Sequence, residues 1–430
     1  MKRDRCQPLY QRWQAMARSQ AQHPAVHLIT GGRVLTFAEL HAAGEAALPS
    51  GRQVVTDEKG LSFLLEVLRA WRDGAVLVPL DGSAGPLPDL AGCHPGICHV
   101  KTTSGSTGTP RQVLFNPDQL AADADQIVRT MGLRRDWPNV AVVSMAHSYG
   151  FSNLVLPLLL HGIPLVIAES PLPQAMRAAL ASGPLFTVAA VPAMWRAWHA
   201  AGLITSKIRL AISAGAPLPL ELERAVFAAS GVKIHNFYGS SECGGIAYDR
   251  TSEPRPDALL VGTAMEDVTL GVDPVTGCLT VRSAAVGCTY TVPDPALADG
   301  RFLTADRVRV EDGAVWLEGR AGEAINVAGR KISPSVIEEK LLALPGVRHC
   351  VVFGIPSMEA TRVDEIVACL NLDETGTIHE VRQASAHQLP ANQQPRHWRI
   401  CPDLEPDARG KISRAAWRER WQRINSAIQS

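Results

Sequence analysis

The amino-acid sequence predicts an α/β protein with a large N-terminal domain built on α/β sheets and a small C-terminal α+β domain. A chain of 430 residues is too long for one ordinary hydrophobic core, which favours two or three domains. Helical and strand-like patterns alternate through the first half, as in a sheet covered by helices on both faces. From about Val261 short strands with turn signals replace this alternation. We therefore place the domains at residues 1–318 and 319–430.

The alternation in the first half begins with a helix. Residues 61–71 are apolar at helical spacing, and Gly74 ends the pattern. Residues 75–79 then form a short apolar run typical of a buried strand. Further strands are expected at 140–143, 164–167 and 210–212, and a further helix at 221–230.

A hairpin is the clearest element of the second half. Residues 308–310 and 314–317 flank Asp312-Gly313, a dipeptide that favours tight hairpin turns. The remaining patterns predict strands at 278–281, 350–353 and 365–372 and a helix at 335–344. The last three of these elements make up the small α+β unit.

The composition argues against several classes of partner. Lys+Arg and Asp+Glu number 42 each, so no bulk charge draws the chain to nucleic acid or to an anionic membrane. The longest apolar run, 154–168, is broken by Pro157 and Pro164 and is too short to span a bilayer. Residues 1–22 lack the apolar core of a signal peptide, and nine cysteines show no framework spacing. We expect a cytoplasmic protein with reduced thiols.

One cluster of potential zinc ligands needs separate mention. Cys93-His94 and Cys98-His99 offer four ligands, but adjacent pairs around Pro95-Gly96 leave little room for a tetrahedral site. No second ligand pair follows at the spacing of a zinc finger. The simpler interpretation is a turn that enters a buried strand.

The segment most indicative of chemistry runs from Lys101 to Arg111 and reads KTTSGSTGTPR. Glycines let backbone N–H groups approach a phosphate, hydroxyl groups donate to its oxygens, and Arg111 adds a cation. The spacing of a Walker A loop is absent, which disfavours a classical P-loop NTPase. A flexible Ser/Gly linker is the alternative interpretation.

Two later segments also suit a nucleotide. Residues 236–242 place an aromatic ring before a glycine turn, with a hydroxyl and a carboxylate behind it. Such a ring can stack on a base, and a carboxylate is the kind of oxygen ligand that Mg²⁺ prefers. Residues 213–217 end a strand in a Gly-Pro turn, where ligand sites of open α/β sheets gather. Taken alone, Glu242 is a solvated acid and the turn an ordinary connection.

The second half adds charged residues of the same kind. Asp306 is a natural partner for ribose hydroxyls, and Gly319-Arg320 and the segment 329–334 follow it. Lys411 lies beside Gly410 near the C-terminus, as a mobile tip would require. A lone Gly-Lys is otherwise a surface feature.

Together these segments resemble the acyl-adenylate-forming superfamily: acyl- and aryl-CoA synthetases, adenylation domains of peptide synthetases, and luciferases. The match also includes residues 35–40 and 74–81, and it follows the family's order over nearly the whole chain. The resemblance implies a ligase that uses ATP and Mg²⁺ to convert a carboxylic acid to acyl-AMP with release of pyrophosphate. The acyl group would then pass to the thiol of CoA or to the phosphopantetheine of an acyl carrier protein. The small C-terminal domain would be mobile.

The resemblance also implies a role for each motif. Lys411, Glu242 and His147 would be catalytic, with Lys411 bridging the carboxylate and the α-phosphate and Glu242 holding Mg²⁺. The nucleotide would be bound by Thr103, Ser104, Gly105, Ser106, Thr107, Gly108, Arg111, Gly215, Ala216, Pro217, Asn236, Phe237, Tyr238, Gly239, Ser241, Asp306 and Arg320. The acyl pocket would be lined by His147, Ser148, Tyr149, Ala190, Cys243 and Gly244.

The chain departs from the family pattern at several positions. Thr109 and Arg111 stand where the family usually has lysines, and Gly322 stands at a hinge position that is commonly Asp or Lys. No Asp follows the His147 region, which argues against an α-amino acid and favours an aryl or medium acyl acid. Two alternatives remain: transfer of the acyl group to a non-thiol acceptor, and a catalytically altered nucleotide-binding member of the same fold.

Overall fold

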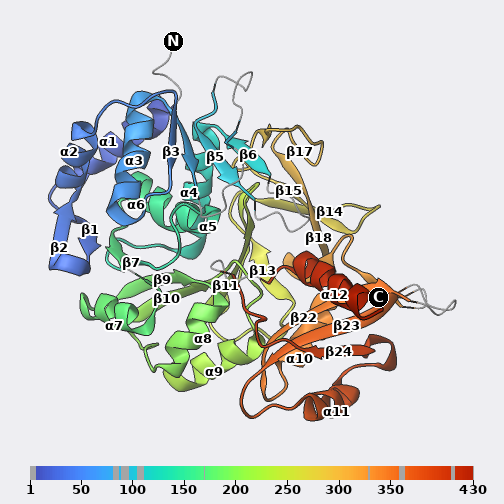
Figure 1. Ribbon diagram of the computed structural model, residues 1–430. Coiled ribbons are helices and arrows are strands. Elements are labelled where there is room, and N and C mark those ends of the chain that lie inside the picture. Colours follow the sequence, from blue (N-terminus) through green and yellow to red (C-terminus); the bar gives the residue numbers. More distant parts are fainter. Residues whose placement is uncertain are drawn as a thin grey trace.

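The computed structural model describes residues 6–80, 87–88, 96–103, 111–168, 170–327, 330–357, 364–407 and 412–429. Figure 1 shows a large N-terminal body, coloured blue through yellow, and a smaller orange and red unit beside it.

A mostly parallel sheet forms the centre of the N-terminal body. Parallel pairing connects its strands in the order β1, β8, β7, β9, β10, β11, and β2 pairs antiparallel with β1 at the edge. The bounds are β1 Pro24–Leu28, β2 Arg33–Thr36, β7 Asn139–Ala141, β8 Leu165–Ile167, β9 Phe186–Ala190, β10 Ile208–Ser213 and β11 Ile234–Ser240. One short 3₁₀ turn, η1 (Thr30–Gly32), lies between β1 and β2.

Helices cover both faces of this sheet, as the alternation in the sequence predicts. On one face α7 (Pro173–Ala181), α8 (Pro192–Ala200) and α9 (Leu220–Ser230) share a core with β7 to β11. On the other face α4 (Pro117–Met131) and α6 (Leu156–His161) pack on residues of β7 to β10. The side chains of β10 alternate between the two cores, with Ala211 on the first and Ile212 on the second.

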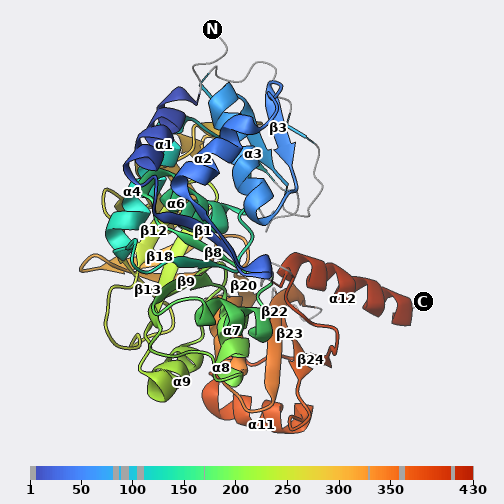
Figure 2. The same ribbon diagram turned by 90° about the vertical axis from the view of Figure 1, so that its left-hand side faces the viewer.

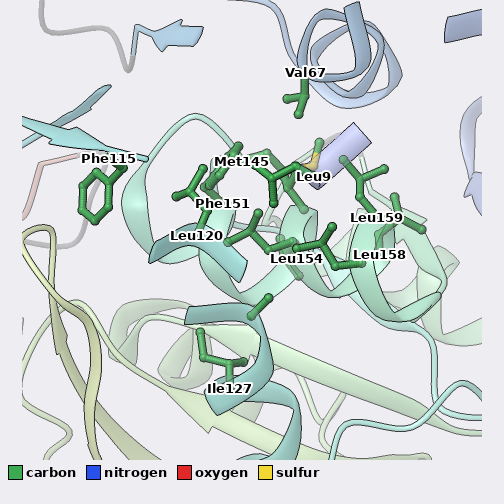
Figure 3. Packing of buried hydrophobic residues seen from close by; sticks show 14 of the residues in the cluster. Leu9, Val67, Phe115, Leu120, Ile127, Met145, Phe151, Leu154, Leu158 and Leu159 are labelled. Carbon is green, nitrogen blue, oxygen red and sulfur yellow. The ribbon is translucent and has the colours of Figure 1, made fainter. Parts of the chain in front are cut away.

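The second face continues into the largest core of the protein. Helices α1 (Gln7–Ser19), α2 (Phe37–Ala46) and α3 (Gly60–Asp73) pack above α4 and α6, and Leu9, Val67 and Leu158 belong to this shared core (Figure 3). Residues Phe151–Val155 form a π-helical segment, η2, between the short α5 (Ser148–Gly150) and α6. Trp13 and Trp71 are completely buried, so their large apolar area stabilises this packing.

Strand β11 joins the parallel sheet to an antiparallel one. Ile234 to Asn236 pair with β10, whereas Phe237 to Ser240 pair antiparallel with β12 (Gly244–Tyr248). The antiparallel part continues through β13 (Leu260–Ala264), β19 (Ala314–Arg320), β18 (Arg301–Glu311), β15 (Cys278–Arg282) and β14 (Thr269–Val272), with β17 (Leu297–Ala298) beside β18.

A second sheet of five strands has the order β16-β6-β5-β4-β3. Four of its strands come from the first 115 residues: β3 Gln53–Thr56, β4 Val76–Pro79, β5 His99–Thr102 and β6 Gln112–Phe115. The fifth, β16 (Thr289–Tyr290), comes from the antiparallel region and pairs with Val113 and Leu114 of β6. Remote parts of the chain thus meet at this edge.

The C-terminal unit has its own core. Helix α10 (Pro334–Leu342) packs on a three-stranded sheet, β22 (Val347–Pro356), β23 (Asp364–Leu372) and β24 (His397–Ile400), around Ile337 and Val352. The hairpin β20 (Ile325–Val327) and β21 (Arg330–Ile332), helix α11 (Ile378–Gln388), the 3₁₀ turn η3 (Ala391–Gln393) and α12 (Arg414–Gln429) complete it. Figure 2 shows α12 extending outward to the C-terminus.

Most of the elements predicted from local patterns are present. The helix at 61–71 is α3, the hairpin at Asp312-Gly313 joins β18 to β19, and the run at 154–168 contains α6 and β8. No helix in the described ranges is long and apolar enough to cross a membrane. Of the potential zinc ligands between residues 93 and 99, His99 begins the buried strand β5, and Cys93 and His94 lie outside the described residues. Among the described residues, no three His, Cys, Asp or Glu side chains form a group that could hold a metal ion.

Candidate active site

Three of the predicted site residues meet where β11 changes partner. The Tyr238 hydroxyl donates to Asp306 Oδ2 at 2.6 Å, and Arg320 Nε donates to Asp306 Oδ1 at 2.7 Å. Asp306 on β18 is directly paired with Arg320 on β19, and this pairing places the carboxylate and the guanidinium on one side. Burial, together with the adjacent Asp306 carboxylate, raises the pKa of Tyr238 well above its usual value. Tyr238 therefore stays neutral and acts as a donor.

The segment after β7 approaches the same region. Ser148 Oγ donates to Ser241 Oγ at 2.9 Å, which connects the expected acyl pocket to the segment that carries Glu242. His147 caps α5, with its Nδ1 accepting the Tyr149 N–H at 3.2 Å. The Tyr149 hydroxyl donates to the carbonyls of Ala190 and Ile212 at 3.4 Å each, at the carboxyl ends of β9 and β10. This is the edge of a parallel sheet where ligands bind.

An aromatic wall lines part of this region. The ring of Tyr149 lies 6.0 Å from the ring of Phe237, between centroids. Phe237 and Cys243 are buried, and burial raises the pKa of the Cys243 thiol. Cys243 is therefore an inert apolar group and not a nucleophile.

Glu242 is held by a residue that the sequence analysis missed. The Tyr290 hydroxyl donates to Glu242 Oε1 at 3.1 Å. The guanidinium of Arg111 lies over the Tyr290 ring, 3.4 Å from its centre, and forms an ion pair with Asp294 at 3.0 Å. Tyr290 lies 48 residues from Glu242, so no local pattern could have indicated their contact.

The base of the expected phosphate loop is closed by two hydrogen bonds. Thr103 N donates to Arg111 O at 2.7 Å, and Arg111 N donates to Thr103 Oγ1 at 2.9 Å. The loop itself, Ser104, Gly105, Ser106, Thr107 and Gly108 included, lies outside the described residues, and so do Gly329 and Lys411.

A buried ion pair lies beneath the site. Lys101 Nζ is 3.2 Å from Asp123 Oδ2 and 3.1 Å from Ser152 Oγ, and Gly245 N donates to Asp123 Oδ1 at 3.4 Å. A Cβ at Gly244 would lie 2.1 Å from the Asp123 carboxylate, so only glycine fits there. The pair thus connects β5, the helix after the acyl pocket and the chain after Glu242. No local pattern predicts this pair, because each charged residue alone is typical of a surface position.

A second buried charge network supports the expected adenine loop, Gly215, Ala216 and Pro217. Arg255 Nη2 donates to Leu218 O at 2.7 Å, directly after that loop, and Arg255 Nε pairs with Glu223 at 2.8 Å. Lys233 bridges Glu223 to Asp249. Asn236 Nδ2 donates to Val261 O at 3.4 Å, and Gly239 lies in β11 where the register with β12 shifts.

The comparisons with known proteins agree with this geometry. Residues 65–287, more than half of the chain, match the model of the family described as AMP-binding enzyme.

The chain belongs to the AMP-binding enzyme family.

The curated relatives are about one quarter identical in sequence to this chain over the aligned residues. It is 28% identical over 338 residues to the probable 2-succinylbenzoate–CoA ligase of Mycobacterium tuberculosis (strain ATCC 25618 / H37Rv), covering 74% of this chain and 83% of the relative. It is 27% identical over 351 residues to feruloyl-CoA synthase of Amycolatopsis sp, covering 76% and 66% respectively. A 2,3-dihydroxybenzoate-AMP ligase of Bacillus subtilis (strain 168) is 26% identical over 362 residues, with 75% of this chain and 64% of that protein covered.

Solved structures show the same fold. ATP-bound MatB from Rhodopseudomonas palustris superposes with a TM-score of 0.83 at 20% identity, covering 99% of this chain and 100% of that one. The o-succinylbenzoate CoA synthetase of Bacillus subtilis, in complex with its acyl-adenylate intermediate, gives a TM-score of 0.80 at 17% identity, with 94% and 97% covered. The predicted superfamily and the predicted α/β fold class are confirmed.

Proposed function

We propose that this AMP-binding enzyme activates an aryl or medium acyl carboxylic acid as acyl-AMP and transfers the acyl group to a thiol of CoA or of a carrier-protein phosphopantetheine. The observation that carries the proposal is the meeting of Tyr238, Asp306 and Arg320 beside Ser241 and Glu242. The named relatives, which include CoA ligases and an AMP ligase for aromatic acids, support the same reaction class.

The donor set suits ATP with Mg²⁺. Asp306 presents a carboxylate that suits ribose hydroxyls, and Arg320 beside it is a cation at the same carboxylate. Glu242 offers Mg²⁺ the hard oxygen ligand that this ion prefers, and its Oε1 is already oriented by Tyr290. Ser213 Oγ is a buried polar atom with no hydrogen-bond partner among the described residues, and it lies two positions before the expected adenine loop Gly215 to Pro217. Bound Mg²⁺ would offset phosphate charge during the reaction.

The first half-reaction brings two anions together. A substrate carboxylate oxygen attacks the α-phosphorus, and the bond from that phosphorus to pyrophosphate breaks. Cations near the reacting atoms reduce the repulsion and stabilise the charge that develops, and Lys411 is the residue we assign to this role. Ser241 would bind the α-phosphate, and its contact with Ser148 would hold that hydroxyl next to the acyl pocket.

The second half-reaction consumes the mixed anhydride. The thiol sulfur bonds to the acyl carbon, the carbon–oxygen bond to AMP breaks, and the thiol proton is released to solvent. The pocket formed by His147, Tyr149 and Ala190 would hold the acyl chain, since the Tyr149 and Phe237 rings offer a planar acid an apolar wall. We infer an aromatic acid as the best fit.

The test is acid-dependent exchange of labelled pyrophosphate into ATP with Mg²⁺, run across benzoates, cinnamates, straight-chain acids and amino acids. We expect exchange with aromatic acids, and we expect its loss in Glu242→Gln. Glu253→Gln is the matched control, because Glu253 is an exposed acid outside the site. Bound ATP without exchange for any acid would refute the proposed function. Saturable product formation with free CoA would identify CoA as the acceptor, whereas formation only with a carrier protein would identify phosphopantetheine.

A further inference from the structure

Asp294 is the residue whose position the proposed reaction does not explain. It lies between Pro293 and Pro295, on the segment that follows β16, and its Oδ1 accepts the Ala296 N–H at 2.8 Å. Its other oxygen, Oδ2, lies 3.0 Å from Arg111 Nη2. The turn and the flanking prolines restrict the backbone, so this carboxylate is fixed in place before any ligand arrives.

Arg111 is oriented from a second side. Its guanidinium stacks 3.4 Å above the centre of the Tyr290 ring, so the planar cation is held face-on by the ring and edge-on by Asp294. The Tyr290 hydroxyl meanwhile donates to Glu242, the acid we assign to Mg²⁺. Arg111 also closes the base of the phosphate loop through its backbone. The cation thus lies at the base of the expected phosphate loop and is already paired with an acid.

We propose that Asp294 is the resident counter-anion of Arg111, which it releases to the phosphates of ATP and of pyrophosphate. This inference rests on the proposed adenylation reaction. Phosphate oxygens and the Asp294 carboxylate compete for the same guanidinium N–H groups, so Asp294 weakens the binding of both anions. The side chains of Arg111 and Asp294 are 38% and 34% exposed, so water can screen the pair and exchange between the two partners costs little.

The competition has a consequence for turnover. Pyrophosphate carries more negative charge than one carboxylate, so it takes the guanidinium when present. Because Asp294 recaptures Arg111, the leaving group is held less tightly and departs more easily. A lysine at position 111 would lose both the planar stack and the fork geometry that this arrangement uses. Asp294 and the arginine therefore form a matched pair.

Calorimetric titration with pyrophosphate in the presence of Mg²⁺ tests the inference directly. Asp294→Asn removes the charge but keeps the oxygen that accepts Ala296 N–H, so the turn is retained. We expect it to bind pyrophosphate about two- to fivefold more tightly, which is the contribution expected of a partly exposed ion pair. Asp299→Asn is the matched control: it removes the same charge from an exposed residue nearby, and we expect affinity equal to that of the unmodified protein.

A double variant decides whether Arg111 carries the effect. Arg111→Gln alone should weaken pyrophosphate binding, and Arg111→Gln/Asp294→Asn should bind no more tightly than Arg111→Gln. Unchanged or weaker binding by Asp294→Asn, or a gain that persists in the double variant, would overturn the inference. If acid-dependent exchange is normal in every variant but none of them changes the affinity for pyrophosphate, only this inference is refuted. A tighter Asp294→Asn complex in a protein that exchanges with no acid refutes only the proposed function.

Discussion

The buried pair Lys101–Asp123 provides the sharpest test of how the site is supported. Both side chains are 1% exposed, and the Asp123 carboxylate also accepts hydrogen bonds from Ser152 Oγ and Gly245 N. Each of these residues belongs to a segment that carries part of the site. Lys101 lies in β5, just before Thr103; Ser152 comes directly after the acyl-pocket segment; and Gly245 comes three residues after Glu242. Three segments of the site are therefore tied to one carboxylate.

Replacing Lys101 with Met removes the ammonium but keeps a chain of similar length. The variant leaves the Asp123 charge buried with only two neutral donors, and breaking a buried pair in this way costs about 3–5 kcal/mol. For a domain of this size each kcal/mol lowers Tm by roughly 2 °C, so we expect a loss of about 6–10 °C. Asp123→Asn strands the lysine charge and should be damaging in the same way.

The double variant Lys101→Met/Asp123→Asn separates charge from packing. No unpaired charge remains in it, so we expect most of the loss to be recovered, to within about 1–2 kcal/mol of the unmodified protein. The assay is thermal unfolding followed by circular dichroism, with pyrophosphate exchange on each variant that is folded at 25 °C. Equal losses in the single and double variants would refute the reasoning, because the cost would then come from shape alone.

Three other predictions follow from contacts in and near the site. Burial lowers the pKa of His99 well below its usual value of about 6.5, so at this position the folded protein binds fewer protons than the unfolded chain. The contribution of His99 to the free energy of unfolding is therefore complete above pH 6.5 and falls as the pH drops. His99→Leu should make the Tm less dependent on pH between about 5 and 7. Asp306→Asn weakens the charged acceptor of Tyr238 and Arg320 and should raise the KM for ATP roughly tenfold or more without changing the KM for the thiol acceptor; equal changes in both would contradict a ribose role. Tyr290→Phe keeps the ring under Arg111 but frees Glu242, so the Mg²⁺ concentration for half-maximal exchange should rise about two- to tenfold while pyrophosphate affinity in the calorimeter stays the same.

Local patterns were sufficient to predict much of the fold. The helix α3, the buried strands β4 and β10, and the hairpin at Asp312-Gly313 each depend on apolar spacing and turn residues within a few positions of one another. Strand β11 shows where such reasoning ends. Its first half pairs with β10 and its second half with β12. This change of partner depends on the rest of the chain, so the local pattern of residues 234–240 does not predict it.

The candidate site divides in the same way. Motif order in the sequence was sufficient to single out Tyr238, Glu242, Asp306 and Arg320, and the structure brings three of these four into direct contact. Tyr290 and Asp294 were missed because β16 reaches β6 only in the folded protein. Asp123 was missed for a related reason: on the amphipathic helix α4 an acid is expected to face solvent, and only its partner on β5 explains its burial.

The linker between the two parts of the chain shows how a hinge at Gly322, which the resemblance implies, would fit this structure. On one side, Arg320 is still paired with Asp306 in the large sheet, and Ala321 N donates to Ala305 O at 2.7 Å. On the other side, Glu323 pairs with Arg414, which also binds Glu338 at 2.7 Å within the C-terminal unit.

Gly322 is the residue between these two anchors. Its φ of +83° lies in the left-handed region that favours glycine, and a Cβ built there would meet no atom within 4 Å. The hydrogen bond from Glu323 N to Arg320 O spans this residue, whereas the ion pairs Arg320–Asp306 and Glu323–Arg414 lie on opposite sides of it. Because Arg320 stays with the N-terminal side and Glu323 with the C-terminal side, a hinge motion here would leave the contacts among Tyr238, Asp306 and Arg320 unchanged.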